Sequence, residues 1–483
     1  MNKIETQDVR IFFDITSLVE FVSLIERYSG IQRFVTSLLS AIWQTEQVDR
    51  CYVSYVDRLS GEVSCFPLGD LSPEILLSPI KMRAFFFPSL PVREDIRFLQ
   101  RYSGRPVKYL YHRMRLDLAM LMGREASFRR YHMTSTQWRS LRFPKREPIN
   151  IKILDLKLMN TFMERGDNLV LLGSSWKDWH TKAFVDLHNA GLVVTTLVHD
   201  LIPILNRGTA DKGMAPVFHD WLLSSAEYTQ KYMANSESTR EDLLNFLSIY
   251  KKTQSVEVLA LTQTSLTTAK PEQKTDGPSF QRVDRAHFGY LIDEMDLDEK
   301  LLWLASTPYV LCVGTIEGRK NGWRLAMAWK KLINEGHEDI PRLIFAGRRG
   351  WNSQPLFDLL HGTGNLYGYV SVLEGPSDEE LDFLYRNCTF TAFPSLYEGW
   401  GLPVGESLSY GKTAVVSNTS SLPEVGLDLV EYCDPSSIAS IAAAVSRLTK
   451  QPERRIELEA RIKIAKLRSW PDVAQDLFRI LAQ

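Results

Sequence analysis

Two glutamates, Glu398 and Glu406, stand on either side of a glycine-rich loop in the segment 389–426. The run 389–393 is apolar and β-branched, which predicts a short buried strand before the loop. Pro403 suits the first position of a helix after the loop, because its missing N–H is not needed there. Loop amides backed by a helix N-terminus suit an anionic phosphate. The two carboxylates cannot both hold that phosphate, because like charges repel, but they can accept hydrogen bonds from sugar hydroxyls. This segment therefore predicts a site for a nucleotide-linked sugar.

A second glycine-containing loop carries two adjacent cations, Arg319 and Lys320. It follows a buried strand predicted for 309–313, and Gly314 comes directly after that strand. Arginine binds phosphate bidentately, whereas lysine acts as a point charge. The nine histidines form no HExxH or similar pair, so the sequence predicts no metal site. We therefore expect Arg319 and Lys320 to neutralise a leaving diphosphate in place of a metal ion.

One histidine, His199, follows a continuous apolar run at 192–198 and should lie at the carboxyl end of a strand. In open α/β sheets this edge faces the ligand crevice. His199 can therefore contact a bound ligand, although a structural histidine remains the alternative.

The pattern FPSxxEGWGLPxxE, with SSLPEV after it, resembles the signature of the retaining glycosyltransferases of family 4, which have the GT-B fold. The resemblance implies that Glu398 contacts the donor sugar and that Glu406 holds the nucleotide ribose. It also implies that His199 lies near the donor sugar and that the two adjacent cations bind the diphosphate. The remaining donor-binding positions that it implies are Gly30, Gly314, Tyr369, Val370, Gly399, Trp400, Gly401 and Leu402. Tyr369 and Val370 are expected at the end of a strand over 366–370, where the backbone would read the base. For Gly30 a simple tight turn is the alternative.

The chain of 483 residues suits two large domains. The GT-B resemblance implies two doubly wound, Rossmann-like α/β domains that face a central cleft. We expect an acceptor-side domain over 1–285, which runs into a polar linker at about 262–306. The nucleotide-sugar donor domain is expected over 307–465. The last segment, 466–483, is expected to be a helix that crosses back to the first domain.

The composition is that of an ordinary globular protein, with 44% hydrophobic and 24% charged residues. A net charge of −1 argues against a dedicated nucleic-acid binder. The sequence has no apolar run long enough to span a membrane and no signal-peptide core at its N-terminus. The five cysteines are scattered and form no CxxC motif, which favours reduced thiols. We therefore expect a cytoplasmic protein.

The segment 81–147 differs from the rest of the first domain. It contains 16 Lys and Arg against five Asp and Glu, with many aromatic residues between them. Amphipathic helices are predicted at about 94–102 and 107–122. Such a segment could lie on an anionic membrane surface, on the inner face of the membrane, or cup a lipid-linked acceptor. The alternative is an insertion with solvated charges and aromatic residues that pack on the domain.

Together these features predict an enzyme that transfers a sugar from a nucleotide diphosphate-sugar to a hydroxyl of a glycan or lipid-linked glycan. The resemblance implies a hexosyltransferase that retains configuration, needs no metal and uses no cofactor besides its donor substrate. A GDP-mannose-like donor is preferred, because the resemblance is to enzymes of bacterial surface polysaccharides. Two alternatives stay open: an inactive nucleotide-sugar or glycan-binding protein, and an inverting or epimerising GT-B enzyme.

Overall fold

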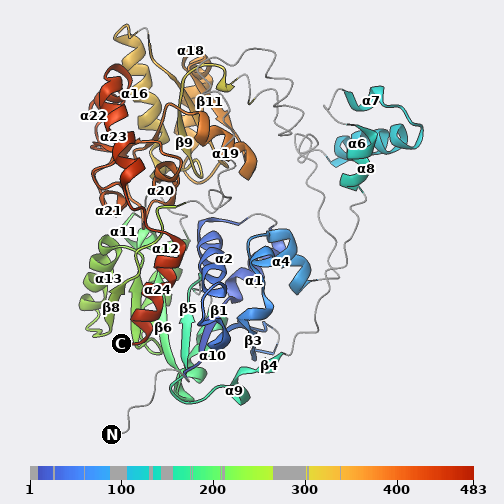
Figure 1. Ribbon diagram of the computed structural model, residues 1–483, viewed down its shortest axis with the longest axis vertical. Coiled ribbons are helices and arrows are strands. Elements are labelled where there is room, and N and C mark those ends of the chain that lie inside the picture. Colours follow the sequence, from blue (N-terminus) through green and yellow to red (C-terminus); the bar gives the residue numbers. More distant parts are fainter. Residues whose placement is uncertain are drawn as a thin grey trace.

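The computed structural model describes residues 9–25, 28–58, 60–87, 106–129, 134–142, 156–174, 176, 178–206, 208, 213–264, 301, 304–337 and 339–483. Within these ranges the chain forms two α/β domains, each built on a mainly parallel sheet (Figure 1). The helix expected at 94–102 and most of the expected linker lie outside the described residues.

The first domain contains an eight-stranded sheet. Its strands, in spatial order, are β4 (Lys157–Leu158), β3 (Val63–Pro67), β2 (Cys51–Val56), β1 (Ile11–Asp14), β5 (Asn168–Leu171), β6 (Val193–Val198), β7 (Lys231–Ala234) and β8 (Ser255–Val258). From β2 to β8 the neighbouring strands are parallel, whereas β3 pairs antiparallel with both β2 and β4. The helices of this domain are α1 (Thr16–Leu24), α2 (Gly30–Trp43), α3 (Pro73–Leu76), α4 (Pro79–Phe86), α9 (Met159–Phe162), α10 (Asp178–Asn189), α11 (Ile202–Leu205), α12 (Met214–Ser225) and α13 (Glu237–Ile249).

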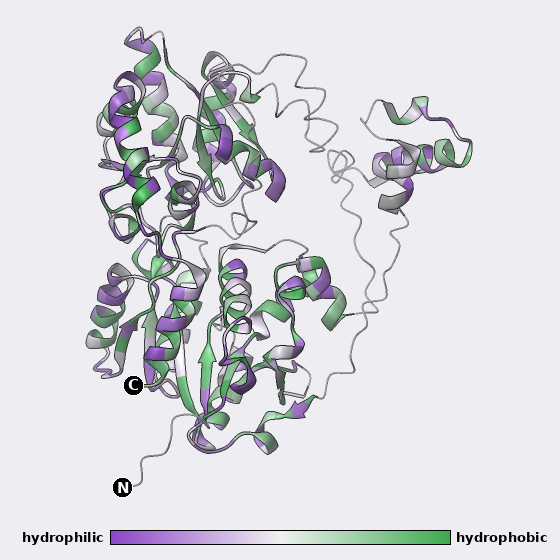
Figure 2. Cartoon of the chain, viewed as in Figure 1, coloured by the Kyte–Doolittle hydropathy of each residue, from purple (hydrophilic) through white to green (hydrophobic). Residues whose placement is uncertain are grey.

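Apolar residues cover both faces of this sheet. In β1, Ile11 and Phe13 belong to one buried cluster and Phe12 belongs to another, because successive side chains of a strand point to opposite faces. A parallel sheet that is covered on both faces reads as a continuous apolar run in the sequence. The short strands of the core are therefore uninterrupted hydrophobic stretches in the sequence. Figure 2 shows the same strands in green.

The second domain contains a six-stranded parallel sheet. Its strands, in spatial order, are β11 (Val370–Leu373), β10 (Arg342–Ala346), β9 (Tyr309–Val313), β12 (Phe390–Phe393), β13 (Ala414–Ser417) and β14 (Glu431–Cys433). Its helices are α16 (Gly322–Asn334), α17 (Gln354–Gly362), α18 (Gly364–Tyr367), α19 (Asp378–Asn387), α20 (Leu402–Ser409), α21 (Leu422–Gly426), α22 (Ile438–Lys450) and α23 (Pro452–Ile464). From β9 the chain proceeds to β10 and β11 on one side, and then returns to β12, β13 and β14 on the other.

The prediction of a strand over 366–370 is wrong. Strand β11 begins only at Val370 and continues to Leu373. The preceding residues 365–367 have positive φ angles of 57°, 48° and 58°, and Gly368 has φ 85°. Leu366 is fully buried, so its apolar character reflects packing from a left-handed turn and not a place in the sheet.

The last helix, α24 (Trp470–Leu481), packs on the first domain. Lys231 Nζ at the start of β7 donates a hydrogen bond of 2.9 Å to the carbonyl oxygen of Ile480. The Trp470 ring lies 6.0 Å from that of Phe34 on α2, centroid to centroid. The chain therefore crosses back from the second domain to the first before it ends (Figure 1).

Three helices from the basic segment form a cluster of their own: α6 (Pro106–Leu121), α7 (Ala126–Arg129) and α8 (Ser135–Arg142). A small apolar core of Leu116, Ala119, Phe128 and Trp138 holds them together. Figure 1 shows this cluster standing apart from both sheets. In the described part of the chain, no helix is both long enough and apolar enough to cross a membrane.

Candidate active site

The second sheet has its topological switch point between β9 and β12, and the two loops singled out by the sequence follow these two strands. Ligands of open α/β sheets bind in the crevice at such a point, outside the carboxyl ends of the strands. Gly314 follows β9 with φ +129°. A Cβ on Gly347, in the loop after β10, would overlap the Gly314 carbonyl oxygen, so the two loops can meet this closely only because residue 347 is glycine.

The basic loop is held against the segments that follow β12 and β14 by hydrogen bonds to and from the backbone. Asn321 has left-handed φ/ψ of 60° and 28°, and its side-chain amide donates to the carbonyl oxygens of Pro394 (2.8 Å) and Pro435 (2.7 Å). The Leu396 amide donates to the carbonyl oxygen of Arg319 at 2.9 Å. These contacts fix the backbone that carries Arg319 and Lys320 against the backbone that carries Glu398.

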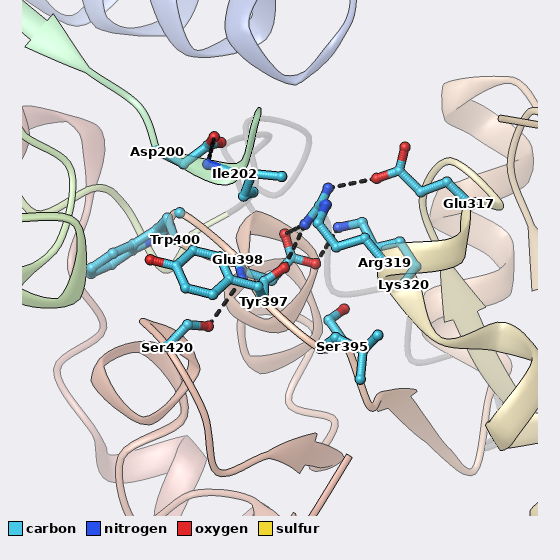
Figure 3. Close-up of polar contacts among 12 residues, drawn as sticks. Asp200, Ile202, Glu317, Arg319, Lys320, Ser395, Tyr397, Glu398, Trp400 and Ser420 are labelled. Atoms are coloured by element: carbon cyan, nitrogen blue, oxygen red, sulfur yellow. Dashed lines mark hydrogen bonds and ion pairs between the residues drawn. The ribbon is translucent and has the colours of Figure 1, made fainter. Parts of the chain in front are cut away.

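Four charged side chains meet at this junction (Figure 3). Lys320 Nζ lies 2.6 Å from Glu398 Oε1, and Arg319 Nη1 lies 2.6 Å from Glu398 Oε2. The second guanidinium nitrogen, Arg319 Nη2, lies 2.6 Å from Glu317 Oε1. We refer to Glu317, Arg319, Lys320 and Glu398 as the ion cluster. A recess beside Lys320 is lined by Cys312, Gly314, Thr315 and Phe345, among others.

The ion cluster keeps Glu398 charged although only 7% of the residue is exposed. Burial alone would raise the pKa of Glu398, but the charges of Arg319 and Lys320 and hydrogen bonds from Lys320 and Ser395 outweigh it and lower the pKa to about 2. Burial would likewise lower the pKa of Arg319, but Glu398 and Glu317 raise it above its ordinary value. At neutral pH Glu398 is therefore ionised beside the Arg319 cation.

His199 and Asp200 of the first domain lie across from the glycine loop. His199 follows β6, and its Nε2 lies 2.8 Å from the carbonyl oxygen of Leu172. Burial lowers the pKa of His199 to about 4, against a smaller opposing effect of that hydrogen bond. The ring is therefore neutral, Nε2–H donates to Leu172, and Nδ1 keeps a lone pair that can accept a hydrogen bond. Asp200 Oδ1 accepts from the Ile202 amide at 3.0 Å, at the start of α11 (Figure 3).

The glycine loop brings the two domains into direct contact. A Cβ on Gly399 would overlap the carbonyl oxygen of His199 and would lie 3.2 Å from Asn235 Nδ2, at the end of β7. Gly401, with φ +110°, is the N-cap of α20, and Leu402 begins that helix. Trp400 is only 6% exposed, and its indole N–H donates to the carbonyl oxygen of Thr262 at 2.9 Å. Trp400 thus fastens the second domain to the end of the first.

Glu406 lies on α20 and faces the first domain. Its Oε2 accepts from the Tyr385 hydroxyl at 2.9 Å, and its Oε1 lies 3.8 Å from Arg33 Nη1 on α2. Arg33 also pairs with Asp378 at 2.8 Å. Burial raises the pKa of Glu406, while the Arg33 charge and the Tyr385 hydroxyl oppose this rise. Glu406 therefore lies at an edge of the site, close to Arg33 of the first domain.

Two predicted donor-binding residues, Tyr369 and Val370, lie elsewhere than expected, and a third, Gly30, has no close neighbour that would require glycine. Val370 pairs with Leu343 at the amino ends of β11 and β10, so Tyr369 and Val370 lie at the edge of the sheet opposite to the crevice. The strand-end argument for these two residues is therefore wrong. Gly30 begins α2, and a Cβ there would meet no heavy atom within 4 Å, so its position does not require glycine.

Sequence reasoning missed two residues that shape this region. Glu317 pairs with Nη2 of Arg319, the guanidinium nitrogen that does not contact Glu398. Its position two residues before Arg319 was the sequence signal for this ion pair. Glu424, from the SSLPEV motif, accepts hydrogen bonds from the amides of Glu237 (2.8 Å) and Ser238 (2.9 Å) at the first turn of α13. A carboxylate of the second domain thereby caps a helix of the first.

A search for metal ligands gives no candidate within the described ranges. No group of three or more His, Cys, Asp or Glu side chains there could hold a metal ion. All five cysteines are free and buried.

Comparisons with known proteins agree with this architecture. Residues 293–465 match the family of glycosyl transferases group 1. Over 168 residues the chain is 37% identical to the O-antigen chain mannosyltransferase B of Escherichia coli, which covers 35% of this chain and 44% of that protein. Over 264 residues it is 25% identical to the serotype-specific mannosyltransferase WbdA of Escherichia coli, which covers 53% of this chain and 30% of that protein. The chain thus spans less than half the length of each of these relatives.

Among solved structures, Anabaena Alr3699/HepE in complex with UDP and glucose aligns over 98% of this chain and 99% of that chain, with a TM-score of 0.53 and 11% sequence identity. This likeness concerns the fold alone. The chain has the GT-B fold, and its second domain contains most of the segment that matches the glycosyl transferases group 1 family.

Proposed function

We propose that this chain is a retaining mannosyltransferase that uses a GDP-mannose-like donor and a glycan or lipid-linked glycan acceptor. The group 1 domain supports sugar transfer. Both of the relatives described above are named as mannosyltransferases, which supports mannose as the sugar. One of them is named for the O-antigen chain, which supports a surface polysaccharide as the product. A third relative, the MMP alpha-(1->4)-mannosyltransferase of Mycolicibacterium hassiacum, is 34% identical over 110 residues, 22% of this chain and 27% of that protein.

The observation that carries the proposal is the ion cluster at the switch point between β9 and β12. In the reaction the bond between the anomeric carbon and the diphosphate oxygen breaks, and negative charge gathers on the leaving diphosphate. The acceptor oxygen forms the new bond to the anomeric carbon, and its proton passes to the departing diphosphate. Arg319 and Lys320 would stabilise the developing charge, because preorganised charges in a buried site act most strongly in the transition state. No metal ion and no covalent intermediate are part of this proposal.

Glu398 and His199 would orient the donor sugar. Glu398 stays ionised at any working pH because its pKa is about 2. It can therefore accept hydrogen bonds from sugar hydroxyls and oppose the positive charge that the ring gains as the leaving group departs. The neutral His199 would accept a hydroxyl hydrogen bond at Nδ1, because its Nε2–H is engaged by Leu172. The glycine loop amides, from Gly399 to Leu402, would add hydrogen bonds to phosphate.

Glu406 would hold the ribose of the donor nucleotide. Its carboxylate is already oriented by the Tyr385 hydroxyl, and Arg33 lies 3.8 Å away. A fixed carboxylate suits a pair of vicinal hydroxyls, which donate two hydrogen bonds. Donor recognition would therefore involve a residue of the first domain as well as the second.

A direct test incubates the purified chain with GDP-mannose and an acceptor glycan and measures release of free GDP. UDP-glucose and GDP-fucose serve as competing donors, and a parallel reaction contains EDTA. We expect GDP release in both buffers, with mannose joined in the α configuration of the donor, as read from the anomeric coupling by NMR. Binding of GDP-mannose without release of GDP would assign the chain to the inactive binders. A product of inverted configuration, or loss of activity in EDTA that added Mg²⁺ restores, would overturn the retaining or the metal-independent part of the proposal.

A further inference from the structure

Helix α6 carries a continuous stripe of large apolar side chains that are exposed to solvent. Their spacing of three and four residues places them on one face of the helix. The stripe consists of Val107 (81% exposed), Leu110 (53%), Tyr111 (62%), Met114 (60%), Leu118 (53%) and Leu121 (79%). It runs almost the whole length of the helix, which for 16 residues is about 24 Å.

The opposite face of α6 is fixed by packing, so the stripe is not the side that the helix buries. Leu116 and Ala119 are 1% and 5% exposed and pack with Phe128 and Trp138 of α7 and α8. On a helical projection these two positions lie roughly opposite to the centre of the stripe. In Figure 1 the cluster stands apart from both sheets, and Figure 2 shows apolar and hydrophilic residues on the same short helices.

Basic side chains border the stripe on both sides. Lys108 and Arg115 lie seven residues apart along one border, and Arg113 lies along the other. Arg124 follows three residues after the end of the helix. Two acidic residues lie nearby, and both accept hydrogen bonds from residues of α8. Asp117 accepts from the Trp138 indole at 3.0 Å. The exposed Glu125 accepts from the Ser135 hydroxyl and, at 3.1 Å, from the Ser135 amide, and these two hydrogen bonds lower the pKa of Glu125. The four cations outnumber these two carboxylates, so the charge around the stripe is net positive.

This combination of an apolar stripe and basic borders fits one surface in particular. An interfacial helix buries its apolar face at the boundary of headgroups and acyl chains, while lysine and arginine reach the lipid phosphates. A protein partner would account for the apolar stripe, but it would not by itself require cations along both borders. Isolated exposed apolar residues, such as Ile464 on α23 at 87%, are ordinary on protein surfaces.

We propose that α6 is a membrane-docking helix that lies in the plane of an anionic bilayer, with the stripe from Val107 to Leu121 toward the acyl chains. The helix has 16 residues and does not span the membrane. The proposal specifies a surface and an orientation, and it holds whether or not the proposed donor and acceptor are correct.

The test uses the full chain in co-sedimentation with vesicles of phosphatidylcholine, alone or mixed with phosphatidylglycerol. We expect binding to the mixed vesicles, weaker binding at higher salt, and little binding to phosphatidylcholine alone. Leu121→Glu should weaken binding by about tenfold or more, since an inserted leucine contributes at least that factor. Arg115→Gln should weaken it by about fivefold, and only on the anionic vesicles. Ile464→Glu is the matched control, because it places the same charge at an equally exposed apolar site on another helix.

The outcomes separate the membrane from other occupants of the stripe. Circular dichroism and the thermal midpoint should be the same for Leu121→Glu and wild type, since Leu121 is exposed. A lower midpoint would mean that the stripe packs on the chain itself, which overturns the proposal. A concentration-dependent dimer in sedimentation velocity that Leu121→Glu abolishes would assign the stripe to a second copy. Absence of vesicle binding, or equal loss in Leu121→Glu and Ile464→Glu, would also overturn it.

Discussion

Replacing Glu398 with glutamine tests whether the ion cluster is a preorganised charge centre or an incidental salt bridge. The substitution preserves the size of the side chain but removes the charge that Arg319 and Lys320 share at 2.6 Å each. Each carboxylate oxygen of Glu398 now accepts a hydrogen bond, one from Arg319 and one from Lys320. In glutamine an NH₂ group, which is a donor, replaces one of these two acceptors. The guanidinium would keep Glu317 as a partner, whereas Lys320 would lose its carboxylate.

The expected loss of stability follows from the pKa of Glu398. Its lowering from 4.5 to about 2 corresponds to about 3 kcal/mol of stabilisation of the ionised form, at about 1.36 kcal/mol per unit. Solvent does not screen this pair appreciably, because the residue is only 7% exposed. A lowered pKa in the folded state stabilises the protein above the unfolded pKa. The contribution is therefore complete at pH 7 and at pH 5.5, and it is lost as the pH falls from about 4.5 toward 2.

Differential scanning calorimetry at pH 7 and pH 5.5 measures this loss. If the second domain unfolds as a unit, about 3 kcal/mol should lower its midpoint by about 6–12 °C, equally at the two pH values. The matched control is Glu335→Gln, because Glu335 pairs with Lys331 on the exposed surface of α16. Solvent-exposed pairs of this kind contribute little, so the control should not shift the midpoint measurably.

Kinetics of the same variant test the chemical role. Glu398→Gln should lower kcat more than it raises the donor KM, because a carboxylate beside a ring that gains positive charge stabilises the transition state more than the ground state. A variant that melts like wild type and turns over like wild type would refute the reasoning. Loss of stability with normal kcat would leave Glu398 a structural residue only.

The remaining predictions concern the other loop, the ribose site and the contact between domains. Lys320→Ala should lower kcat by about two to three orders of magnitude in a folded protein, whereas the control Lys331→Ala, at an exposed lysine, should not. Near-normal turnover of Lys320→Ala would exclude Lys320 as a stabiliser of leaving-group charge. Glu406→Gln should mainly raise the donor KM, because bonds to the ribose are similar in ground and transition states; a collapse of kcat instead would reverse the assigned roles. Gly399→Ala should lower kcat/KM by about tenfold or more, since its Cβ would overlap a backbone carbonyl of the first domain. Gly362→Ala, where a Cβ meets nothing within 4 Å, is the control, and equal activity of the two variants would show that the tight contact is not needed.

The strands that position the site could be read from the sequence because they are buried on both faces. The runs expected at 309–313 and 389–393 are strands β9 and β12, the latter beginning one residue later. The apolar run expected at 192–198 is β6 at 193–198. Once these strands are placed in parallel, geometry brings the loops that follow them to one edge, and the motifs in those loops must meet.

The strand expected at 366–370 shows where apolar character misleads. A buried leucine in a left-handed turn has the same hydropathy as a buried leucine in a strand, and the sequence pattern does not contain the φ angle. Gly364 and Gly368 flank the turn and were the available signal, because glycine often marks left-handed backbone. The error moved the expected base-reading residues to the wrong end of β11.

Contacts between the domains could not be derived from the sequence, because they depend on how two separate sheets face each other. Arg33 lies near Glu406, and Glu424 caps α13, although more than 180 residues separate Glu424 from Ser238. Neither pair has a spacing that a motif could reveal. These two contacts form only when the domains meet, so they report on how the domains pack together and not on either domain alone.

The ion cluster imposes a condition on how the donor can bind. Arg319 and Lys320 already share the charge of Glu398, so a diphosphate that these cations hold must compete with that carboxylate for their N–H groups. Glu317 and the side-chain hydrogen bonds of Asn321 would keep the basic loop in place during this exchange, because neither depends on Glu398. As the cations turned to the diphosphate, Glu398 would gain free lone pairs for the hydroxyls of the proposed sugar. In the proposed reaction, binding of the leaving group and release of the Glu398 carboxylate would therefore be one event, and two motifs about 80 residues apart would act as a single site.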